Sequence, residues 1–308
     1  MSQSTTCPTI LLLGCNGQVG WELQRSLSVL GHLVSLGSRS SLNPHGLCGD
    51  FTDLVGLQAT LDRVQPHIIV NASAYTAVDK AEAEPALATQ INATAPALLA
   101  EHAAKTGAWL IHFSTDYVFN GQGDRPWQED DTPAPLSVYG QSKLAGEQAV
   151  ARHAKHLILR TSWVYASRGG NFAKTMLRLA SERDTLRVIN DQWGAPTSAE
   201  LLADVVAQAI PQLQRNPALA GSYHCAATGY TTWFDYARLV LTLAQAHGHT
   251  LTVKPELVEA IPTSAYPTPA QRPLNSRLNT HKLQTHFGLQ LPHWESGVRR
   301  MLTEITGS

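Results

Sequence analysis

The stretch Thr9-Ile10-Leu11-Leu12-Leu13-Gly14-Cys15-Asn16-Gly17-Gln18-Val19-Gly20 decides the fold class. Its first five residues form an apolar run, which is typical of a parallel strand buried on both faces. Residues 21–27, which follow, have the periodicity of a helix. A strand, a glycine turn and a helix in this order are the context of a dinucleotide-binding loop.

Each glycine of this loop has its own expected task. Gly14 permits the tight turn, Gly17 lets a pyrophosphate approach N–H groups at the positive helix end, and Gly20 allows close helix–strand packing. The spacing is G-x-x-G-x-x-G, whereas the commonest dehydrogenases have G-x-G-x-x-G. A glycine-rich stretch is often only a turn, but its place between strand and helix favours phosphate binding.

Strand-like and helix-like segments alternate along the rest of the chain. Further strands are expected at 33–36, 67–71, 109–114, 157–165, 186–197 (with a turn) and 221–224, and helices at 53–65, 78–104, 139–147, 172–182, 199–213 and 233–247. The alternation predicts an α/β fold: a Rossmann-type doubly wound parallel sheet with a smaller, interleaved C-terminal substrate-binding domain. We expect residues 1–165 to form the NAD(P)-binding domain, with a returning segment near 195–220, and residues 166–308 mainly to bind the substrate.

Tyr139 and Lys143 lie four residues apart in a segment with helical character, so both side chains are expected on one helix face. The ammonium should lower the pKa of the phenol, normally about 10, and a fall of about 3 units needs about 4 kcal/mol. A phenol with a pKa near neutral can exchange a proton with a substrate oxygen. Thr115 ends an apolar run, so its hydroxyl could bind the same oxygen from a rigid support. A tyrosine and a lysine at this spacing often lie on a helix surface without a function. Here the upstream glycine loop supports a functional role for the pair.

The end of the second strand bears on the coenzyme. NAD-specific proteins often place a carboxylate there to hold the ribose 2′-hydroxyl. Here the sequence is Gly37-Ser38-Arg39-Ser40, without a carboxylate. Ser38 and Arg39 could accept a 2′-phosphate instead, which favours NADPH, with NADH as the alternative. If Arg39 instead faces solvent, it gives no reason to prefer NADPH over NADH.

Three further segments are candidates for ligand contacts. Asp50 and Phe51 fit an adenine contact, with Asp50 accepting from the exocyclic amine. The residues after the third strand, Ala74-Tyr75-Thr76, would let a coenzyme lie against the backbone, unless they serve only close packing. Arg272, in a proline-broken segment, is either a phosphate ligand for the substrate or an exposed loop arginine.

The composition excludes several classes of function. Charged residues make up 15% of the chain and the formal net charge is -1, so nucleic acid or an anionic membrane is not an expected partner. The four cysteines are dispersed, which fits reduced thiols in a cytoplasm, and no secretion signal or membrane-spanning run is visible. No metal-ligand cluster is evident, because the 13 histidines are scattered.

The glycine loop, Thr115 and the Tyr139-x-x-x-Lys143 pair together resemble the extended short-chain dehydrogenase/reductases. Five stretches narrow the match: STDYVF at 114–119, VYG at 138–140, RTSWVY at 160–165, DQWGAPT at 191–197 and RPLNS at 272–276. Over nearly the whole chain, the sequence resembles the dTDP-4-dehydrorhamnose reductase family.

The resemblance implies that NADPH or NADH reduces the 4-keto group of dTDP-4-dehydro-6-deoxy-L-mannose to give dTDP-L-rhamnose. It implies that Tyr139 protonates the forming alkoxide, that Lys143 holds the nicotinamide ribose, and that Thr115 binds the reacting oxygen. It further implies coenzyme contacts for Gln18, Val19, Asp50, Phe51, Ala74, Tyr75 and Thr76, and sugar-nucleotide contacts for Asp116 and Trp163. Members of the family are often homodimers, and some carry Mg²⁺ between subunits, although no ligand cluster here predicts that metal.

Two other functions remain open at this point. One is a nucleotide-sugar epimerase or dehydratase of the same superfamily, although dehydratases commonly place an acidic pair beside the threonine and this chain has Asp116 and Tyr117. The other is a non-catalytic NADP-binding regulatory subunit. Intact Thr115, Tyr139 and Lys143 favour an enzyme.

Overall fold

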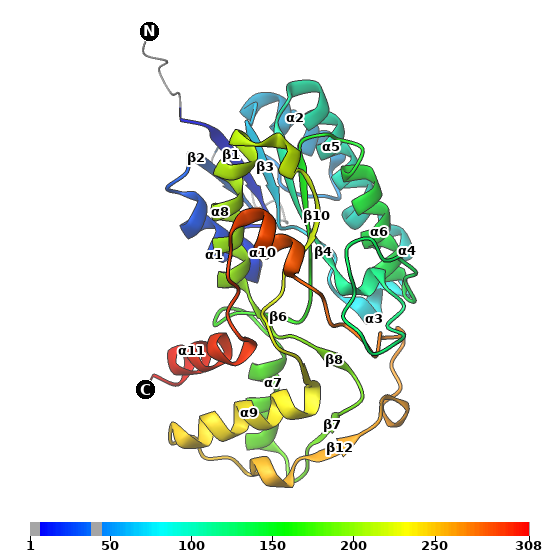
Figure 1. Cartoon of the computed structure of the whole chain (residues 1–308), viewed down its shortest axis with the longest axis vertical. Helices are drawn as coiled ribbons and strands as arrows, with labels where there is room; N and C mark the ends of the chain where they lie inside the picture. The colour runs from blue at the N-terminus through cyan, green and yellow to red at the C-terminus, as the bar shows by residue number, and fades with distance from the viewer. Residues whose placement is uncertain (1–6, 38–44, 308) are drawn as a thin grey trace.

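The structure is a computed structural model that describes residues 7–37 and 45–307. Ser38 and Arg39, predicted to contact the 2′-phosphate, lie outside the described residues. Figure 1 shows a sheet covered by helices and, below it, a second group of helices and short strands.

Within the described residues, six parallel strands form the central sheet. They are β1 (Thr9–Leu13), β2 (His32–Leu36), β3 (Ile68–Asn71), β4 (Trp109–Thr115), β5 (His156–Thr161) and β10 (Gly221–His224). Their order across the sheet is β10-β5-β4-β3-β1-β2, and every neighbouring pair is parallel. The predicted α/β class with a doubly wound parallel sheet is confirmed.

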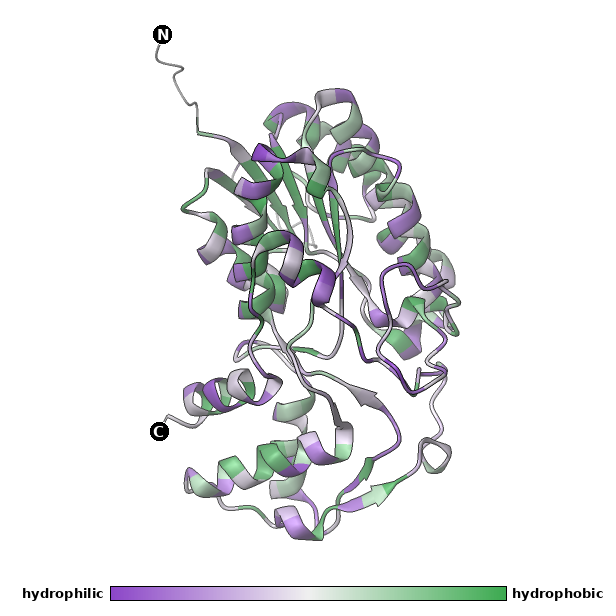
Figure 2. Cartoon of the chain, in the orientation of Figure 1, coloured by the Kyte–Doolittle hydropathy of each residue, from purple (hydrophilic) through white to green (hydrophobic). Residues whose placement is uncertain are grey.

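Helices cover both faces of this sheet (Figure 1). Side chains on the two faces alternate along β1: Ile10 and Leu12 join one core cluster, and Leu11 and Leu13 join another. The first cluster includes α1 (Gln18–Leu27), α8 (Ala199–Arg215) and α10 (His281–Phe287). The second includes α2 (Leu54–Val64), α5 (Ala95–Thr106) and the end of α6 (Val138–Val150). Figure 2 shows hydrophobic strands in the central sheet, beside helices that mix hydrophobic and hydrophilic residues.

The region 78–104, expected to be helical, consists of four pieces. These are α3 (Val78–Ala81), α4 (Pro85–Thr89), the π-helical turn η1 (Gln90–Thr94) and α5. Pro85 and Pro96 each lie in a first helical turn. The π-helical turn was not predicted, and such turns often occur at functional sites.

The second group of elements follows β5. Its helices are α7 (Phe172–Glu182), α9 (Trp233–Ala246) and α11 (Trp294–Thr306). Short 3₁₀ turns lie at several points of the chain: η2 (Asp116–Val118), η3 (Pro217–Leu219), η4 (Pro255–Leu257) and η5 (Thr263–Ala265). Three strand pairs complete the second group: β6 (Val164–Tyr165) with β9 (Thr197–Ser198), β7 (Arg187–Ile189) with β12 (Glu259–Ile261), and β8 (Trp193–Gly194) with β11 (Thr231–Thr232).

Two predicted strands differ from the structure. The run 157–165 is not one strand, because Trp163 has a φ of 49° and separates β5 from β6. The run 186–197 is three short strands rather than a strand and a turn, since each piece pairs with a different partner.

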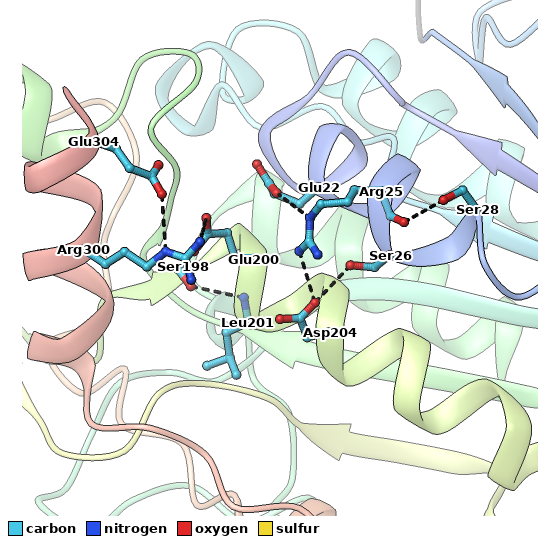
Figure 3. Close-up of polar contacts among 10 residues, drawn as sticks. All are labelled: Glu22, Arg25, Ser26, Ser28, Ser198, Glu200, Leu201, Asp204, Arg300 and Glu304. Atoms are coloured by element: carbon cyan, nitrogen blue, oxygen red, sulfur yellow. Dashed lines mark hydrogen bonds and ion pairs between the residues drawn. The ribbon is translucent and has the colours of Figure 1, made fainter. Parts of the chain in front are cut away.

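Ion pairs connect α1, α8 and α11 at the surface (Figure 3). Arg25 lies 3.2 Å from Asp204, and Arg300 lies 3.5 Å from Glu200. Both arginine side chains are more than half exposed, so each pair contributes little to stability. Across the described ranges, no helix is both long and apolar enough to cross a bilayer.

Candidate active site

The glycine loop joins β1 to α1 as predicted. Gly14 has a φ of 86°, and a Cβ on it would lie 2.6 Å from the Ser73 nitrogen. A Cβ on Gly20 would lie 2.0 Å from the Gly14 carbonyl oxygen, so helix and loop pack too closely for any other residue. No side chain within the described ranges caps the N-terminus of α1 after Gly17. The N–H groups of Gln18 and Val19 therefore begin a helix whose positive end suits a phosphate.

The loop after β3 lies beside Gly14, and its position depends on Asn92 of the π-helical turn. The Asn92 amide accepts a bond from the Tyr75 nitrogen at 2.9 Å and donates to the Tyr75 carbonyl at 3.1 Å. It also donates to the Ser142 hydroxyl of α6 at 3.0 Å. Asn92 thus fixes the predicted coenzyme-lining loop, which includes Ala74 and Thr76, relative to the helix that carries Tyr139.

The predicted adenine contacts, Asp50 and Phe51, lie just before α2 in the chain. Phe51 is buried in the core and does not expose its ring. Asp50 is partly exposed, and its Oδ1 accepts bonds from the backbone and side chain of Thr52. Its carboxylate is therefore held in one orientation.

Thr115 and Tyr139 meet at the carboxyl end of β4. Thr115 is the last residue of β4, and Tyr139 lies in the first turn of α6, which Ser137 caps through a bond from the Gly140 nitrogen. The two side chains are hydrogen-bonded. Tyr117 packs edge-on against the Tyr139 ring at 5.6 Å. The structure therefore brings these predicted site residues together.

Lys143 lies one turn further along α6 and is buried, with 2% of its surface exposed. Its Nζ donates to the Phe113 carbonyl oxygen of β4 at 2.6 Å. Burial lowers the pKa of Lys143 to about 8, while the nearby Glu147 carboxylate partly opposes that shift.

The predicted lowering of the Tyr139 pKa is wrong for this structure. Burial raises that pKa to about 12, the bond with Thr115 partly opposes the rise, and the Asp116 charge adds to it. Desolvation disfavours the phenolate more than its neighbours favour it. Tyr139 therefore holds its proton at neutral pH.

Asp116 directly follows Thr115 and is 2% exposed. Its Oδ1 accepts a bond from the Thr115 hydroxyl at 3.1 Å. Its Oδ2 is buried and, among the described residues, has no hydrogen-bond partner of normal geometry. Burial raises the pKa of this carboxyl to about 7, against the opposing effects of Ser276 and Thr115.

Arg272 approaches the same site from the C-terminal loop. Its Nη2 donates to Asp79 of α3 at 2.7 Å, and a hydrogen bond also connects it with Tyr117. The pairing with Arg272 contributes to lowering the pKa of the Asp79 carboxyl. Arg272 is thus a held, partly buried side chain rather than a free loop arginine.

Trp163 lies in the second group of elements, and its ring contacts residues of that group rather than β4. Its ring stacks on Trp233 with centroids 3.6 Å apart, and it packs so closely on Gly194 that a Cβ there would lie 2.5 Å from the Trp163 Cε2. The positive φ of Trp163 is rare for a bulky residue and marks a strained position, which often accompanies function.

Two buried polar pairs near α6 were not predicted. Asn71 and His112, neighbours on β3 and β4, are hydrogen-bonded at 3.0 Å, and burial keeps the His112 pKa well below its usual range. Arg160 of β5 binds Glu147 of α6 at 2.7 Å, and both residues are 5% exposed or less. No sequence spacing indicates either pair, because the partners come from different elements.

Among the described residues, neither a metal-ligand group nor the hollow beside α10 adds to the site. Across residues 7–37 and 45–307, no group of three or more His, Cys, Asp or Glu side chains is arranged to hold a metal ion. A surface hollow of about 430 Å³ lies beside α10, lined in part by Glu129, Lys282 and His286, and none of the candidate site residues borders it.

Comparisons with known proteins agree with this geometry. Residues 8–306 match the family model described as the RmlD substrate binding domain. The chain belongs to this family. A dTDP-4-dehydrorhamnose reductase of Salmonella typhimurium is 58% identical to the chain over 297 residues, which cover 96% of the chain and 97% of that protein. The family predicted from the sequence is confirmed.

Solved structures give the same answer. The dTDP-4-dehydrorhamnose reductase of Bacillus anthracis, in complex with NADP, has a TM-score of 0.84 and 35% identity and covers 97% of this chain and 100% of that one. A UDP-glucose 4-epimerase of Thermus thermophilus in complex with NAD has a TM-score of 0.78 at 18% identity and covers 97% of this chain and 99% of that one. The second likeness concerns the fold alone.

Proposed function

We propose that this chain is a reductase that converts the 4-keto group of dTDP-4-dehydro-6-deoxy-L-mannose into the hydroxyl of dTDP-L-rhamnose with NAD(P)H. The observation that carries the proposal is the hydrogen-bonded Thr115–Tyr139 pair at the end of β4, in a chain 58% identical to a reductase of that name. When bound, the reduced nicotinamide supplies the hydride for the sugar C4.

Tyr139 is the proton donor. With a pKa raised to about 12, its phenol is protonated at neutral pH, so it is always ready as an acid. An alkoxide formed by reduction of a ketone is a stronger base than a phenolate and therefore takes the proton. Thr115, which is hydrogen-bonded to Tyr139, lies beside the same oxygen and helps to position it.

Lys143 supports this step. The Phe113 carbonyl fixes its ammonium under Tyr139, and the remaining donors of the ammonium suit the hydroxyls of the nicotinamide ribose. A pKa near 8 leaves it mainly charged at neutral pH.

The coenzyme lies along the glycine loop in this proposal. Residues 1–165, with α8 and β10, bind it through Gly14, Gly17, Gln18, Val19, Gly20, Asp50, Ala74, Tyr75, Thr76, Tyr139 and Lys143. The Phe51 ring is buried in the core and is not part of this surface. NADPH is preferred because Ser38 and Arg39 offer donors to the 2′-phosphate. Arg39→Ala should raise the Kd of NADPH about tenfold and leave that of NADH nearly unchanged, as measured by fluorescence titration. Equal effects on both coenzymes would remove the basis of the preference.

The sugar nucleotide contacts Asp116, Trp163 and Arg272. Arg272, already fixed by Asp79, has an Nη1 that is buried without a partner among the described residues, and a substrate phosphate would satisfy it. Residues 166–308 mainly supply this binding surface.

The assembly and location follow from the family resemblance alone. We propose a homodimer in the cytoplasm, with neither nucleic acid nor membrane as partner. Light scattering coupled to gel filtration would give twice the chain mass for the dimer, and a single-chain mass would contradict it. Within residues 7–37 and 45–307 of one chain, no group of side chains forms a Mg²⁺ site, and no step of the proposal uses a metal.

The test is to mix the purified protein with NADPH and dTDP-4-dehydro-6-deoxy-L-mannose and follow the loss of nicotinamide absorbance. Stoichiometric oxidation with formation of dTDP-L-rhamnose is expected. Oxidation only with another keto-sugar nucleotide would keep the class and reject this substrate. Coenzyme binding without turnover would favour the regulatory subunit, and an epimerised or dehydrated product without net oxidation would favour the epimerase or dehydratase.

A further inference from the structure

The two oxygens of the buried Asp116 carboxyl differ in their hydrogen bonds. Oδ1 receives the Thr115 hydroxyl at 3.1 Å, whereas Oδ2 is buried without a normal partner among the described residues. A carboxylate buried in this way is costly to keep ionised, and a carboxylic acid is less so. The position thus favours a group that carries a proton.

The hydrogen bonds around Thr115 have a direction. A threonine hydroxyl donates one proton and accepts others. While Asp116 is a carboxylate, the Thr115 hydroxyl donates to its Oδ1. When Asp116 carries a proton, the same 3.1 Å contact lets Oδ1 donate to the Thr115 oxygen, and Thr115 then donates to Tyr139, the direction in which this bond lowers the Tyr139 pKa. Tyr139, Thr115 and Asp116 therefore form an unbroken hydrogen-bonded row that ends at the carboxyl.

We propose that Asp116 stores the proton that restores Tyr139, and that the Thr115 hydroxyl passes it on. The proposal rests on Tyr139 being the acid of the proposed function. As the Tyr139 O–H bond breaks and its proton joins the substrate oxygen, Thr115 gives its proton to the phenolate. Thr115 takes the Asp116 proton in exchange, which leaves a carboxylate that water protonates after product release. Asp116 acts through Thr115 and is therefore a positioning and proton-supplying residue.

Ser276 of the C-terminal loop and Thr115 of β4 hydrogen-bond to Asp116, and the Asp116 charge acts on Tyr117 of its own turn and on Tyr139 of α6. Arg272 and Asp79 act on Tyr117. Burial raises the Asp116 pKa to about 7 against the bonds from Ser276 and Thr115, still far below the value of about 12 for Tyr139, so transfer from the carboxyl to the phenolate is downhill.

The sign of the pH dependence follows. The hydrogen-bonded row can pass a proton to Tyr139 only when Asp116 is protonated. We therefore expect kcat/KM to be high below pH about 7 and to fall as the pH rises above that value. Lys143, with a pKa near 8, should give a second fall at higher pH, because only its charged form holds the ribose. The two falls must be separated by mutation.

The first experiment compares the pH profile of kcat/KM in the wild type and Asp116→Asn. The amide still binds a sugar hydroxyl but cannot supply the proton. We expect kcat/KM at pH 6 to fall by about tenfold or more and the fall near pH 7 to disappear, while the fall near pH 8 stays. Asp204→Asn, the same change in the exposed ion-pair cluster, should keep the complete wild-type profile.

Two further variants test the row itself. Thr115→Ser should keep the fall near pH 7, and Thr115→Val should abolish it. Ser276→Ala removes a hydrogen bond that lowers the Asp116 pKa, so the fall should move to higher pH. The solvent isotope effect on kcat in mixed H₂O and D₂O should show several protons in the wild type and one in Asp116→Asn.

An Asp116→Asn profile that keeps the fall near pH 7, with only a raised KM for the sugar nucleotide, would overturn the relay and leave Asp116 as a binding residue. A Ser276→Ala profile that moves to lower pH would also overturn it, even if Asp116→Asn does not fold. A wild type that does not oxidise NADPH with the keto-sugar would overturn the proposed function and the relay together. The two failures are thus distinct.

Discussion

Two regions of the molecule are held in position by different forces. The contact between α6 and strands β4 and β5 is polar although it is buried: Lys143 binds a backbone carbonyl, and Glu147 binds Arg160. The region around Trp163 is apolar and held by shape: the ring lies between Trp233 and Gly194. Buried charges tolerate little displacement, whereas stacked rings fix a plane and leave its edge open to a ligand.

The difference assigns separate tasks to the two regions. In the proposed function, the α6 region holds the groups that move protons, so changes there should lower kcat. The Trp163 region offers a flat apolar surface, so changes there should raise KM for the sugar nucleotide and affect kcat less. The predictions below test this division, beginning with the largest effect.

Tyr139→Phe should lower kcat by about 10²–10⁴-fold, because the alkoxide loses its positioned proton donor. NADPH affinity should stay close to that of the wild type, which fluorescence titration would measure alongside steady-state turnover. Tyr230→Phe makes the same change on a partly exposed C-terminal loop and should leave kcat unchanged. Turnover of Tyr139→Phe close to normal would remove Tyr139 from the mechanism.

Glu147→Ala should lower the free energy of unfolding by about 3–5 kcal/mol, because it leaves the buried Arg160 charge without its partner. Arg25→Ala breaks an exposed ion pair of the α1–α8–α11 cluster (Figure 3) and should cost less than about 1 kcal/mol. Denaturant unfolding measures both. Equal losses would mean that burial does not distinguish the two ion pairs.

Trp163→Ala should raise KM for the sugar nucleotide about tenfold, which corresponds to about 1.4 kcal/mol of lost contact. The value lies within the range of an aromatic ring stacked on a base or a similar flat group. Steady-state kinetics at saturating NADPH would separate KM from kcat. An unchanged KM would place the ring outside the binding surface.

Gly194→Ala should have the smallest effect and act through Trp163. The added Cβ would lie 2.5 Å from the Trp163 Cε2, so the ring must shift. We expect KM for the sugar nucleotide to rise about threefold, by about 0.7 kcal/mol. Gly170→Ala, where a Cβ meets no atom within 4 Å, is the matched control. The same KM in both variants would contradict the coupling between Gly194 and Trp163.

The sequence predicted the features that depend on neighbouring residues. The β1–glycine loop–α1 unit follows from an apolar run and three glycines, and the Tyr139–Lys143 spacing places both residues on α6. The sequence could not identify the role of Asn92, because that role depends on hydrogen bonds to Ser142 of α6 and to the Tyr75 loop. The break at Trp163 was missed for a similar reason: its strained backbone depends on packing against Gly194 and Trp233.

Electrostatics was the least predictable part of the site. A lysine four residues from Tyr139 predicts a lowered phenol pKa, yet burial raises it to about 12. The raised pKa of Asp116 also depends on burial, which a single sequence does not report. Spacing identifies which groups meet, and the dielectric around them decides their protonation.

The central claim is that Tyr139 and Thr115, where α6 meets β4, serve a reduction at the sugar C4. The most direct measurement uses NADPH deuterated at the transferred position of the nicotinamide C4 and locates the label in the product by NMR. The account predicts deuterium at C4 of dTDP-L-rhamnose with the wild type, at a rate at least about 10²-fold lower with Tyr139→Phe. Deuterium at another carbon, or equal rates of labelling with both proteins, would contradict it.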